Sequence, residues 1–210
     1  MNLQDIKIIK SRRKTISLSV KRGKVIVRAP YGTANDYIFE FISRHSAWIE
    51  KQLAKPVAAK LVLDDGALLT LFGEIYCIES GRTRVTKGVI YLPQEGREAA
   101  LTRLLKKLAL EKMSALTEQI AKRFGFEYSG IRISSARGRW GSCSQKRSIS
   151  YSFRMAFLSP ALCEYVAVHE LCHTLCFNHS KDFWTIVERA LPDWKIRRKM
   201  LKNSPAMSYL

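Results

Sequence analysis

Three of the chain's four histidines lie in the eleven residues HELCHTLCFNH, which run from His169 to His179. On a helix, His169 and His173 lie one turn apart, so both imidazoles leave the same face about 6 Å from each other. Two imidazoles at this spacing can bind one small divalent cation, as in the HExxH pattern of zinc hydrolases. Glu170 is rotated by about 100° from that face, which suits contact with a water held by the metal. We therefore predict a metal centre on this helix.

A catalytic zinc ion usually has three protein ligands and one open position. His179 is the predicted third ligand, because it follows the helix end and a turn can bring its imidazole back to the metal. We expect Asn178 to make that turn in a left-handed conformation. The spacing matches the metzincin pattern, although Cys176 stands where metzincins usually have glycine. Glu188, fifteen residues beyond His173, is the alternative third ligand.

The chemistry of such a centre follows from the cation. One zinc ion per chain would lower the pKa of a bound water and polarise the attacked carbonyl or phosphoryl oxygen, with other divalent metals as possible occupants. Glu170 is the predicted general base, which takes the proton of the metal-activated water and returns it to the leaving group. Alternatively, the segment forms a closed structural zinc site from Cys172, His173, Cys176 and His179. That site would leave His169 and Glu170 without a role.

The chain is strongly basic. Thirty-six Lys and Arg against 18 Asp and Glu give a formal charge of +18, which points to a polyanionic partner or an anionic substrate. Residues 128–154 contain six basic side chains and no carboxylate, namely Arg132, Arg137, Arg139, Lys146, Arg147 and Arg154. This stretch precedes the histidine helix, so we expect a basic cleft that attracts acidic peptides, nucleotides or proteins bound to nucleic acid.

Several residues of this stretch are candidates for substrate binding. Arg139 and Arg154 are predicted to contact substrate. The candidates for stabilising a developing oxyanion are these two arginines, Tyr151 and Tyr165. We also predict that the strand at 148–157 forms the edge of the cleft, where an extended substrate can pair as a further strand.

The elements that position these residues are visible in the apolar spacing. Residues 14–28 read as a hairpin, residues 37–53 as a helix on which His45 is structural, and residues 61–92 as further hairpins. A long helix is expected from Arg97 to about Phe124. Strands follow at 131–134 and 148–157. We therefore predict an α+β chain with two parts, a β-rich subdomain with one helix over 1–95 and a zincin-like subdomain over 96–210.

Caps define the helices around the histidines. Ser159 and Pro160 form a cap and first-turn pair for the helix that carries His169 and His173. Ser180 is the expected cap of the next helix, and Pro192 opens a last basic helix that ends near Lys202. Five cysteines, an odd number at irregular spacings, fit free thiols in a reducing compartment. With neither a signal-peptide pattern nor a membrane span, we expect a cytoplasmic protein without a membrane partner.

Two long segments resemble one family. RGRWGSCSQKRSISYSFRMAFLSP and YVAVHELCHTLCFNHSKDFW are similar to the YgjP-like metallopeptidases, as are the earlier segments RRKTISLSVKRGKVIVRAP and AWIEKQL. The family is related to the SprT-like zinc metallopeptidases, some of whose members act on proteins crosslinked to DNA. The resemblance implies zinc on His169, His173 and His179, with Glu170 catalytic. It also implies that Trp140, Gly141 and Ser142 shape the cleft beside the metal.

The predicted function is zinc-dependent hydrolysis of peptide bonds in peptides or proteins. A nucleotide hydrolase is one alternative, in which the basic groove holds the phosphates of a phosphoanhydride. The chain lacks a P-loop and the carboxylate clusters usual for magnesium sites, which argues against this alternative. The other alternative is a non-enzymatic nucleic-acid-binding protein with structural zinc.

Overall fold

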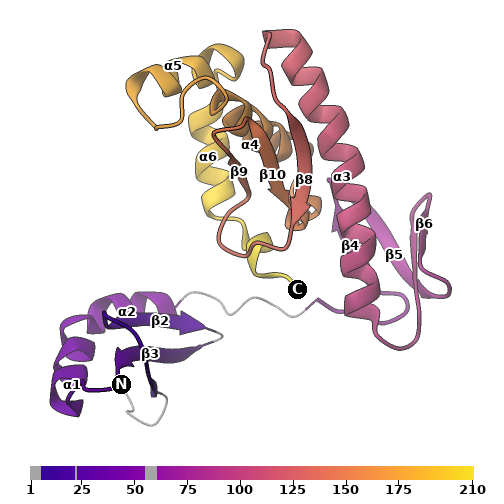
Figure 1. Ribbon diagram of the computed structural model, residues 1–210. Coiled ribbons are helices and arrows are strands. Elements are labelled where there is room, and N and C mark those ends of the chain that lie inside the picture. The colour runs from indigo at the N-terminus through magenta and orange to yellow at the C-terminus, as the bar shows by residue number, and fades with distance from the viewer. Residues whose placement is uncertain (1–5, 22, 55–60) are drawn as a thin grey trace. The chain divides into compact units, whose positions relative to one another are not determined.

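The computed structural model describes residues 6–21, 23–54 and 61–210, and it is a mixed α+β structure (Figure 1). The described residues fall into two compact units, which divide between Ala59 and Lys60. The predicted subdomain boundary at residue 95 stays a prediction. The strands before residue 95 share a core with the long helix after it.

The described residues of the first unit form three strands and two helices. The strands are β1 (Ile6–Ser11), β2 (Ser17–Lys21) and β3 (Lys24–Pro30). The predicted hairpin is the antiparallel pair β2–β3, and β1 pairs with β3 in parallel, so the sheet order is β1-β3-β2. Alternate residues of β3 pack against the helices, because successive side chains of a strand point to opposite faces.

The helical part of this unit is two helices and not the one expected. The helix α1 (Asn35–Arg44) ends at His45, and α2 (Ser46–Leu53) begins directly after it. His45 leaves the helical conformation, with φ of −107° and ψ of 13°. Its side chain is exposed, and its Nδ1 atom lies 2.7 Å from the carbonyl oxygen of Phe41. His45 therefore closes a helix end, which fits the predicted structural role.

The second unit begins with a four-stranded sheet. Its strands are β4 (Leu68–Leu71), β5 (Glu74–Ser80), β6 (Arg84–Thr86) and β7 (Val89–Leu92), in the order β4-β5-β7-β6. Two hairpins, β4–β5 and β6–β7, are joined by the parallel pair β5–β7. The predicted hairpins of this region are thus present.

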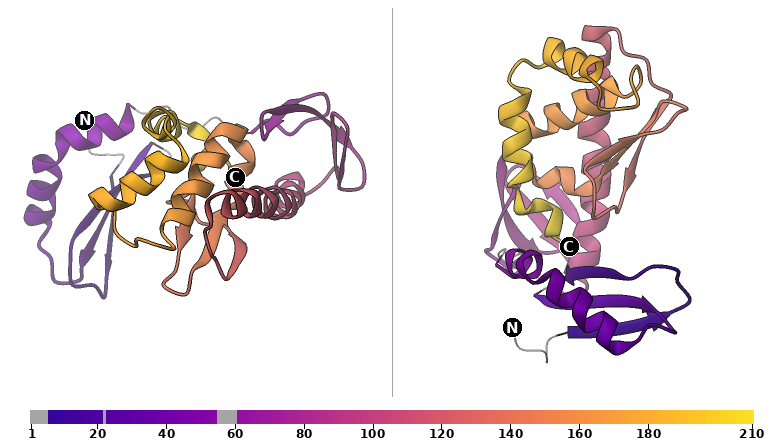
Figure 2. Two further views of the ribbon diagram at one scale, coloured as in Figure 1. Left: turned by 90° about the horizontal axis from the view of Figure 1, so that it is seen from above. Right: turned by 90° about the vertical axis from the view of Figure 1, so that its left-hand side faces the viewer.

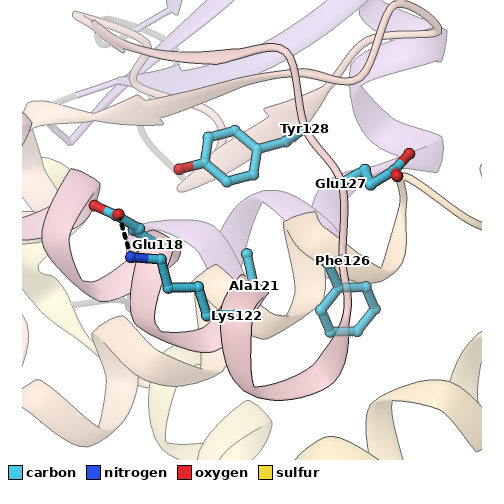
Figure 3. Close-up of a pocket in the computed structure, with 6 residues that line it drawn as sticks. All are labelled: Glu118, Ala121, Lys122, Phe126, Glu127 and Tyr128. Carbon is cyan, nitrogen blue, oxygen red and sulfur yellow. Dashed lines mark ion pairs between the residues drawn. The ribbon is translucent and has the colours of Figure 1, made fainter.

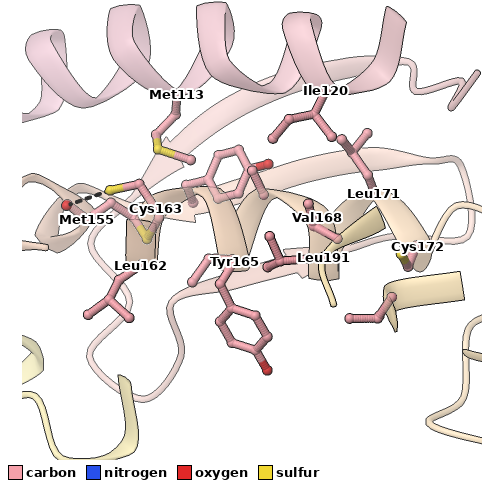
Figure 4. Close-up of a cluster of buried hydrophobic side chains, with 14 of the residues drawn as sticks. Met113, Ile120, Met155, Leu162, Cys163, Tyr165, Val168, Leu171, Cys172 and Leu191 are labelled. Atoms are coloured by element: carbon pink, nitrogen blue, oxygen red, sulfur yellow. Dashed lines mark hydrogen bonds between the residues drawn. The ribbon is translucent and has the colours of Figure 1, made fainter. Parts of the chain in front are cut away.

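The 28-residue helix α3 (Arg97–Phe124) has the predicted bounds and contributes to two cores. Its first half packs on the four-stranded sheet, where Leu101 and Leu105 join Ile78 and Ile90. Its second half packs on the histidine helix, and Figure 4 shows Met113 and Ile120 pointing from α3 towards that helix. One helix therefore links residues 61–95 to the site, and Figure 2 shows its course from two further directions.

A second sheet and five helical segments complete the described part of the unit. The strands β8 (Gly130–Ser134), β9 (Gly141–Cys143) and β10 (Ser148–Ser152) have the order β8-β10-β9. The 3-10 helix η2 (Phe153–Phe157) follows, so the strand predicted over 148–157 ends at Ser152. The last elements are α4 (Pro160–Cys172), α5 (Lys181–Ala190), α6 (Trp194–Lys202) and the 3-10 helix η3 (Pro205–Ser208). Within the described parts of the chain, no helix has both the length and the apolar character needed to cross a bilayer.

A buried hydrogen bond joins α3 to the central strand of this sheet. The hydroxyl oxygens of Thr117 and Tyr151 lie 3.0 Å apart, and both side chains are fully buried. Thr117→Val should lower the free energy of unfolding by about 1–3 kcal/mol, because it leaves the buried phenol without a partner. Denaturant titration measures the change, and the double variant Thr117→Val/Tyr151→Phe should recover much of the loss. A double variant as unstable as the sum of the single variants would contradict this role.

Candidate metal centre

The three histidines of the sequence motif meet at one point. The Nε2 atom of His169 lies 3.2 Å from Nε2 of His173 and 3.1 Å from Nε2 of His179. One ligand atom from each of the three lies within 4.8 Å of those of the other two. His169 belongs to α4, which begins after Ser159 with Pro160 in its first turn, as predicted, although the Ser159 side chain makes no capping hydrogen bond. His173 is the residue that ends this helix.

A short turn returns His179 to the helix. The side-chain oxygen of Asn178 accepts a hydrogen bond from the backbone N–H of Ser180 at 3.2 Å and lies at the same distance from the Cys176 thiol. Asn178 is not among the described residues with positive φ, so its predicted left-handed conformation is wrong. Its side chain closes the turn instead, as asparagine does in Asx turns. Ser180 then caps α5 as predicted, since its hydroxyl accepts a hydrogen bond from the N–H of Phe183.

A hydrogen bond fixes the tautomer of His173 and leaves its Nε2 lone pair free. Nδ1 of His173 lies 3.0 Å from the carbonyl oxygen of Cys176. Because a carbonyl can only accept, Nδ1 carries the proton and the neutral ring has its lone pair on Nε2. Burial lowers the pKa of His173 and lowers that of His169 to about 3, with a further contribution from the neighbouring histidines. Neutral imidazoles are the form that binds metal ions.

The donor set fits a tetrahedral divalent cation such as zinc. With zinc–nitrogen bonds of about 2.0–2.1 Å, two ligands of a tetrahedral site lie about 3.3–3.4 Å apart, close to the separations from His169 Nε2. Two buried atoms beside the cluster, Nδ1 of His169 and Oε2 of Glu170, have no hydrogen-bond partner among the described groups. The site therefore combines imidazole ligands with two buried polar atoms that make no hydrogen bond within the described protein.

Two aromatic side chains of α5 hold the imidazoles in place. Phe183 is fully buried and stacks on His173, with ring centroids 4.5 Å apart and an interplanar angle of 28°. It meets His169 and His179 edge-on. Trp184 stacks on His179 with centroids 5.7 Å apart. The helix after the turn thus fixes the directions in which the ligands point.

The alternative ligand sets are not assembled. Within the described chain, the metal-ligating side chains that gather here are His169, His173 and His179 alone. Cys172 is fully buried in the core, and the Cys176 thiol contacts Asn178 and Ser180. These positions argue against the closed thiolate site. Glu188 is exposed and lies 3.9 Å from the ammonium of Lys195, so it is not the third ligand here.

Glu170 lies beside the cluster in a buried position. Its side chain is 4% exposed, and burial raises its pKa to about 8, while the charge of Arg139 acts in the opposite direction. It packs directly on the backbone of β9. A Cβ atom added to Gly141 would lie 2.5 Å from Oε1 and 2.6 Å from Cγ of Glu170. Gly141 is therefore the residue type that this close approach requires.

A cavity of about 210 Å³ opens beside Glu170 and His169. Three of the predicted substrate-binding residues line it, namely Arg139, Trp140 and Gly141. Ser142 follows them on β9 but does not line the cavity. Leu201, from the last helix, also lines it, and sequence reasoning missed that residue because nothing in its spacing connects α6 to the motif. The remaining lining residues are Tyr165 and Val166.

Arg154 lies apart from this cavity. It is 2% exposed, and its guanidinium donates to the carbonyl oxygens of Tyr209, Leu210, Ser135 and Ala136. These contacts join the C-terminal segment to the loop after β8. They favour a structural role over the predicted substrate contact.

The predicted edge of the cleft also changes. β10 pairs with β8 on one side and with β9 on the other, so its backbone groups are already used. The edge strand beside α4 is β9, which is not among the strands predicted from the sequence. A three-residue strand that contains glycine has no alternation of apolar and polar residues, so the sequence pattern did not indicate a strand there.

A second cavity, of about 540 Å³, lies at the C-terminal end of α3 (Figure 3). It is lined by Glu118, Ala121, Lys122, Phe126, Glu127 and Tyr128. Its ionic groups include the pair Lys122–Glu118, whose charged atoms lie 2.7 Å apart. The histidine cluster does not contribute to its lining.

Comparison with known proteins supports a metallopeptidase. The family described as YgjP-like, metallopeptidase domain, matches residues 14–204. A search of curated proteins gives no match. A crystal structure of the metallopeptidase zymogen of Pyrococcus abyssi abylysin is 25% identical, with a TM-score of 0.39. That match covers 43% of this chain and 94% of the other chain.

Replacing any one of the three clustered histidines should weaken metal binding. His169→Ala, His173→Ala and His179→Ala each remove one ligand, so we expect at least about a 100-fold loss of zinc affinity, more than loss of a supporting group typically costs. Zinc content after dialysis and competition with a chelating dye measure it. His45→Ala is the matched control, because His45 lies outside the cluster. Full zinc occupancy in any of the three variants would show that the ligand set is wrong.

Gly141→Ala should destabilise the protein through its clash with Glu170. We expect a loss of about 1–3 kcal/mol in the free energy of unfolding. The loss should shrink in a Glu170→Ala background, where the clashing atoms are absent. Gly130→Ala is the control, since nothing lies within 4 Å of a Cβ at that position. An equal loss from Gly141→Ala in both backgrounds would exclude this contact as its cause.

Proposed function

The chain belongs to the YgjP-like metallopeptidase family, and we propose that it hydrolyses peptide bonds with one zinc ion bound by His169, His173 and His179. The observation that carries the proposal is the convergence of the three Nε2 atoms beside a buried carboxylate. When bound, zinc would polarise the scissile carbonyl and lower the pKa of a water. The cytoplasmic location stays a prediction.

Glu170 is the proposed general base. Its carboxylate is buried next to the ligand His169, and Gly141 lets it lie against the edge strand. Burial favours the neutral acid, whereas a nearby cation favours the carboxylate. A carboxylate held between these two influences can take a proton from the attacking water and deliver it to the leaving amine.

The edge strand β9 is the proposed binding surface for the peptide. Its partner β10 occupies one side, and an extended substrate can pair with the other side as a further strand. Trp140 and Gly141 line the cavity beside it, and Ser142 follows. Tyr165, which lines the same cavity from α4, is our candidate for stabilising the developing oxyanion.

The two other functions fit the site less well. A nucleotide hydrolase would need groups that hold a triphosphate, and the cavity beside the histidines has one lining arginine, Arg139. A protein with only structural zinc would have a closed set of four ligands, whereas three histidines gather here. Nucleic acid binding through the basic surface stays a prediction. Parallel assays with nucleoside triphosphates and with an unstructured peptide library separate the two hydrolase functions.

Glu170→Gln should strongly slow peptide hydrolysis and leave the metal in place. The amide keeps the size of the side chain but cannot take a proton, so we expect kcat to fall by about 10²–10⁴-fold. Zinc content and turnover of a fluorogenic peptide are measured on the same preparation. Glu111→Gln, an exposed position on α3, is the control. Undiminished turnover with zinc bound would contradict the role of Glu170.

A further inference from the structure

We propose that Arg139 and Arg198 make the site selective for peptides with acidic side chains next to the cleaved bond. The two arginines come from different elements that border the same cleft, the loop before β9 and the helix α6. This selectivity rests on the proposed peptidase function and names its substrate class.

Arg139 borders the cleft directly. Its side chain is exposed and lines the cavity together with His169 and Glu170. A substrate carboxylate in this cavity would therefore lie within reach of the Arg139 guanidinium.

Arg198 borders the histidine cluster through an aromatic contact. Its guanidinium carbon lies 4.8 Å from the ring centroid of Trp184, and that ring lies 5.9 Å from the ring of His169. Leu201, three residues further along α6, lines the cavity and so lies on the same side of the helix. The contact with Trp184 restrains the guanidinium and leaves its N–H groups available to a carboxylate.

Neither arginine is neutralised by the protein. The carboxylates around α6 are used by its other bases, since Arg197 pairs with Glu164 and Asp193 and Lys195 with Glu188. Among the described residues, no carboxylate lies within ion-pair distance of Arg139 or Arg198. The one acidic residue that lines the cavity is Glu170. The cleft thus carries positive charge that a substrate can neutralise.

An acidic peptide fits this arrangement better than a nucleic acid does. Nucleic acids present a repeating row of phosphates, which proteins bind with several basic side chains in succession. Here the Arg139 side chain lines a cavity of about 210 Å³ beside a free strand edge, and the Arg198 guanidinium lies over Trp184 next to the histidines. Two separate cations suit single carboxylates on the side chains of an extended peptide.

The direct test compares three fluorogenic peptides that differ only at the residues flanking the cleaved bond, which are Glu, Gln or Lys. For the zinc-loaded wild type, we expect kcat/KM to be about fivefold higher for the Glu peptide than for the Gln peptide, and lowest for Lys. The difference should lie mainly in KM and should shrink as salt is added. Equal values for Glu and Gln peptides would overturn the proposal.

Charge reversal identifies the residues. Arg139→Glu and Arg198→Glu should each remove the preference for Glu, and the double variant should prefer Lys. Lys146→Glu and Lys199→Glu are the matched controls, because they make the same charge change at exposed positions near β9 and on α6. Loss of the preference in the controls to the same extent would mean that net charge, and not these two arginines, sets it.

A binding measurement separates this proposal from the peptidase function. Fluorescence anisotropy of the same peptides on zinc-loaded Glu170→Gln protein reports selectivity without turnover. Tighter binding of the Glu peptide that is lost in Arg139→Glu/Arg198→Glu supports the acidic site even if no peptide is cleaved. Absence of cleavage in every wild-type assay would refute the peptidase function alone. A single-stranded oligonucleotide that displaces the Glu peptide at lower concentration than unlabelled Glu peptide would reassign the arginines to nucleic acid and overturn the proposal.

Discussion

The approach of three imidazole nitrogens to one another is the constraint on which the rest of the site depends. Nε2 of His169 lies 3.1–3.2 Å from the corresponding atoms of His173 and His179. Neutral imidazoles that turn lone pairs towards one point repel each other unless a proton or a cation lies between them. The fold supplies the geometry in advance, with a buried helix end, a side-chain-closed turn and the rings of Phe183 and Trp184. A metal ion removes the repulsion, so binding and local order support each other.

The sheet β8-β10-β9 positions the other parts of the site, which are the edge strand and Glu170. β10 is held from both sides and therefore fixes β9 at the edge, next to the helix that carries the ligands. Gly141 then lets the carboxylate of Glu170 lie on the strand itself, so the proposed base and the proposed peptide-binding edge are in contact. The helix α6, which follows the histidine motif in the sequence, adds Leu201 to the lining of the cavity beside Glu170.

Local chemistry made much of this predictable. Three predicted features depend on neighbouring residues, which periodicity and side-chain type report directly. They are the start of α4 at Pro160, the cap Ser180 and the bounds of α3. Three features depended on distant partners instead. Arg154 was predicted to contact substrate, but its guanidinium donates hydrogen bonds to the carbonyl oxygens of Tyr209 and Leu210. The contribution of α6 to the cleft and the position of β9 at the sheet edge both require the tertiary fold.

X-ray absorption at the zinc edge of the purified, metal-loaded protein tests the central claim most directly. Three histidine ligands and an open position predict imidazole nitrogens and at least one further light atom, all at about 2.0–2.1 Å, with one zinc per chain. A sulfur shell at about 2.3 Å would show that a thiolate closes the site. That result would contradict the catalytic centre described above.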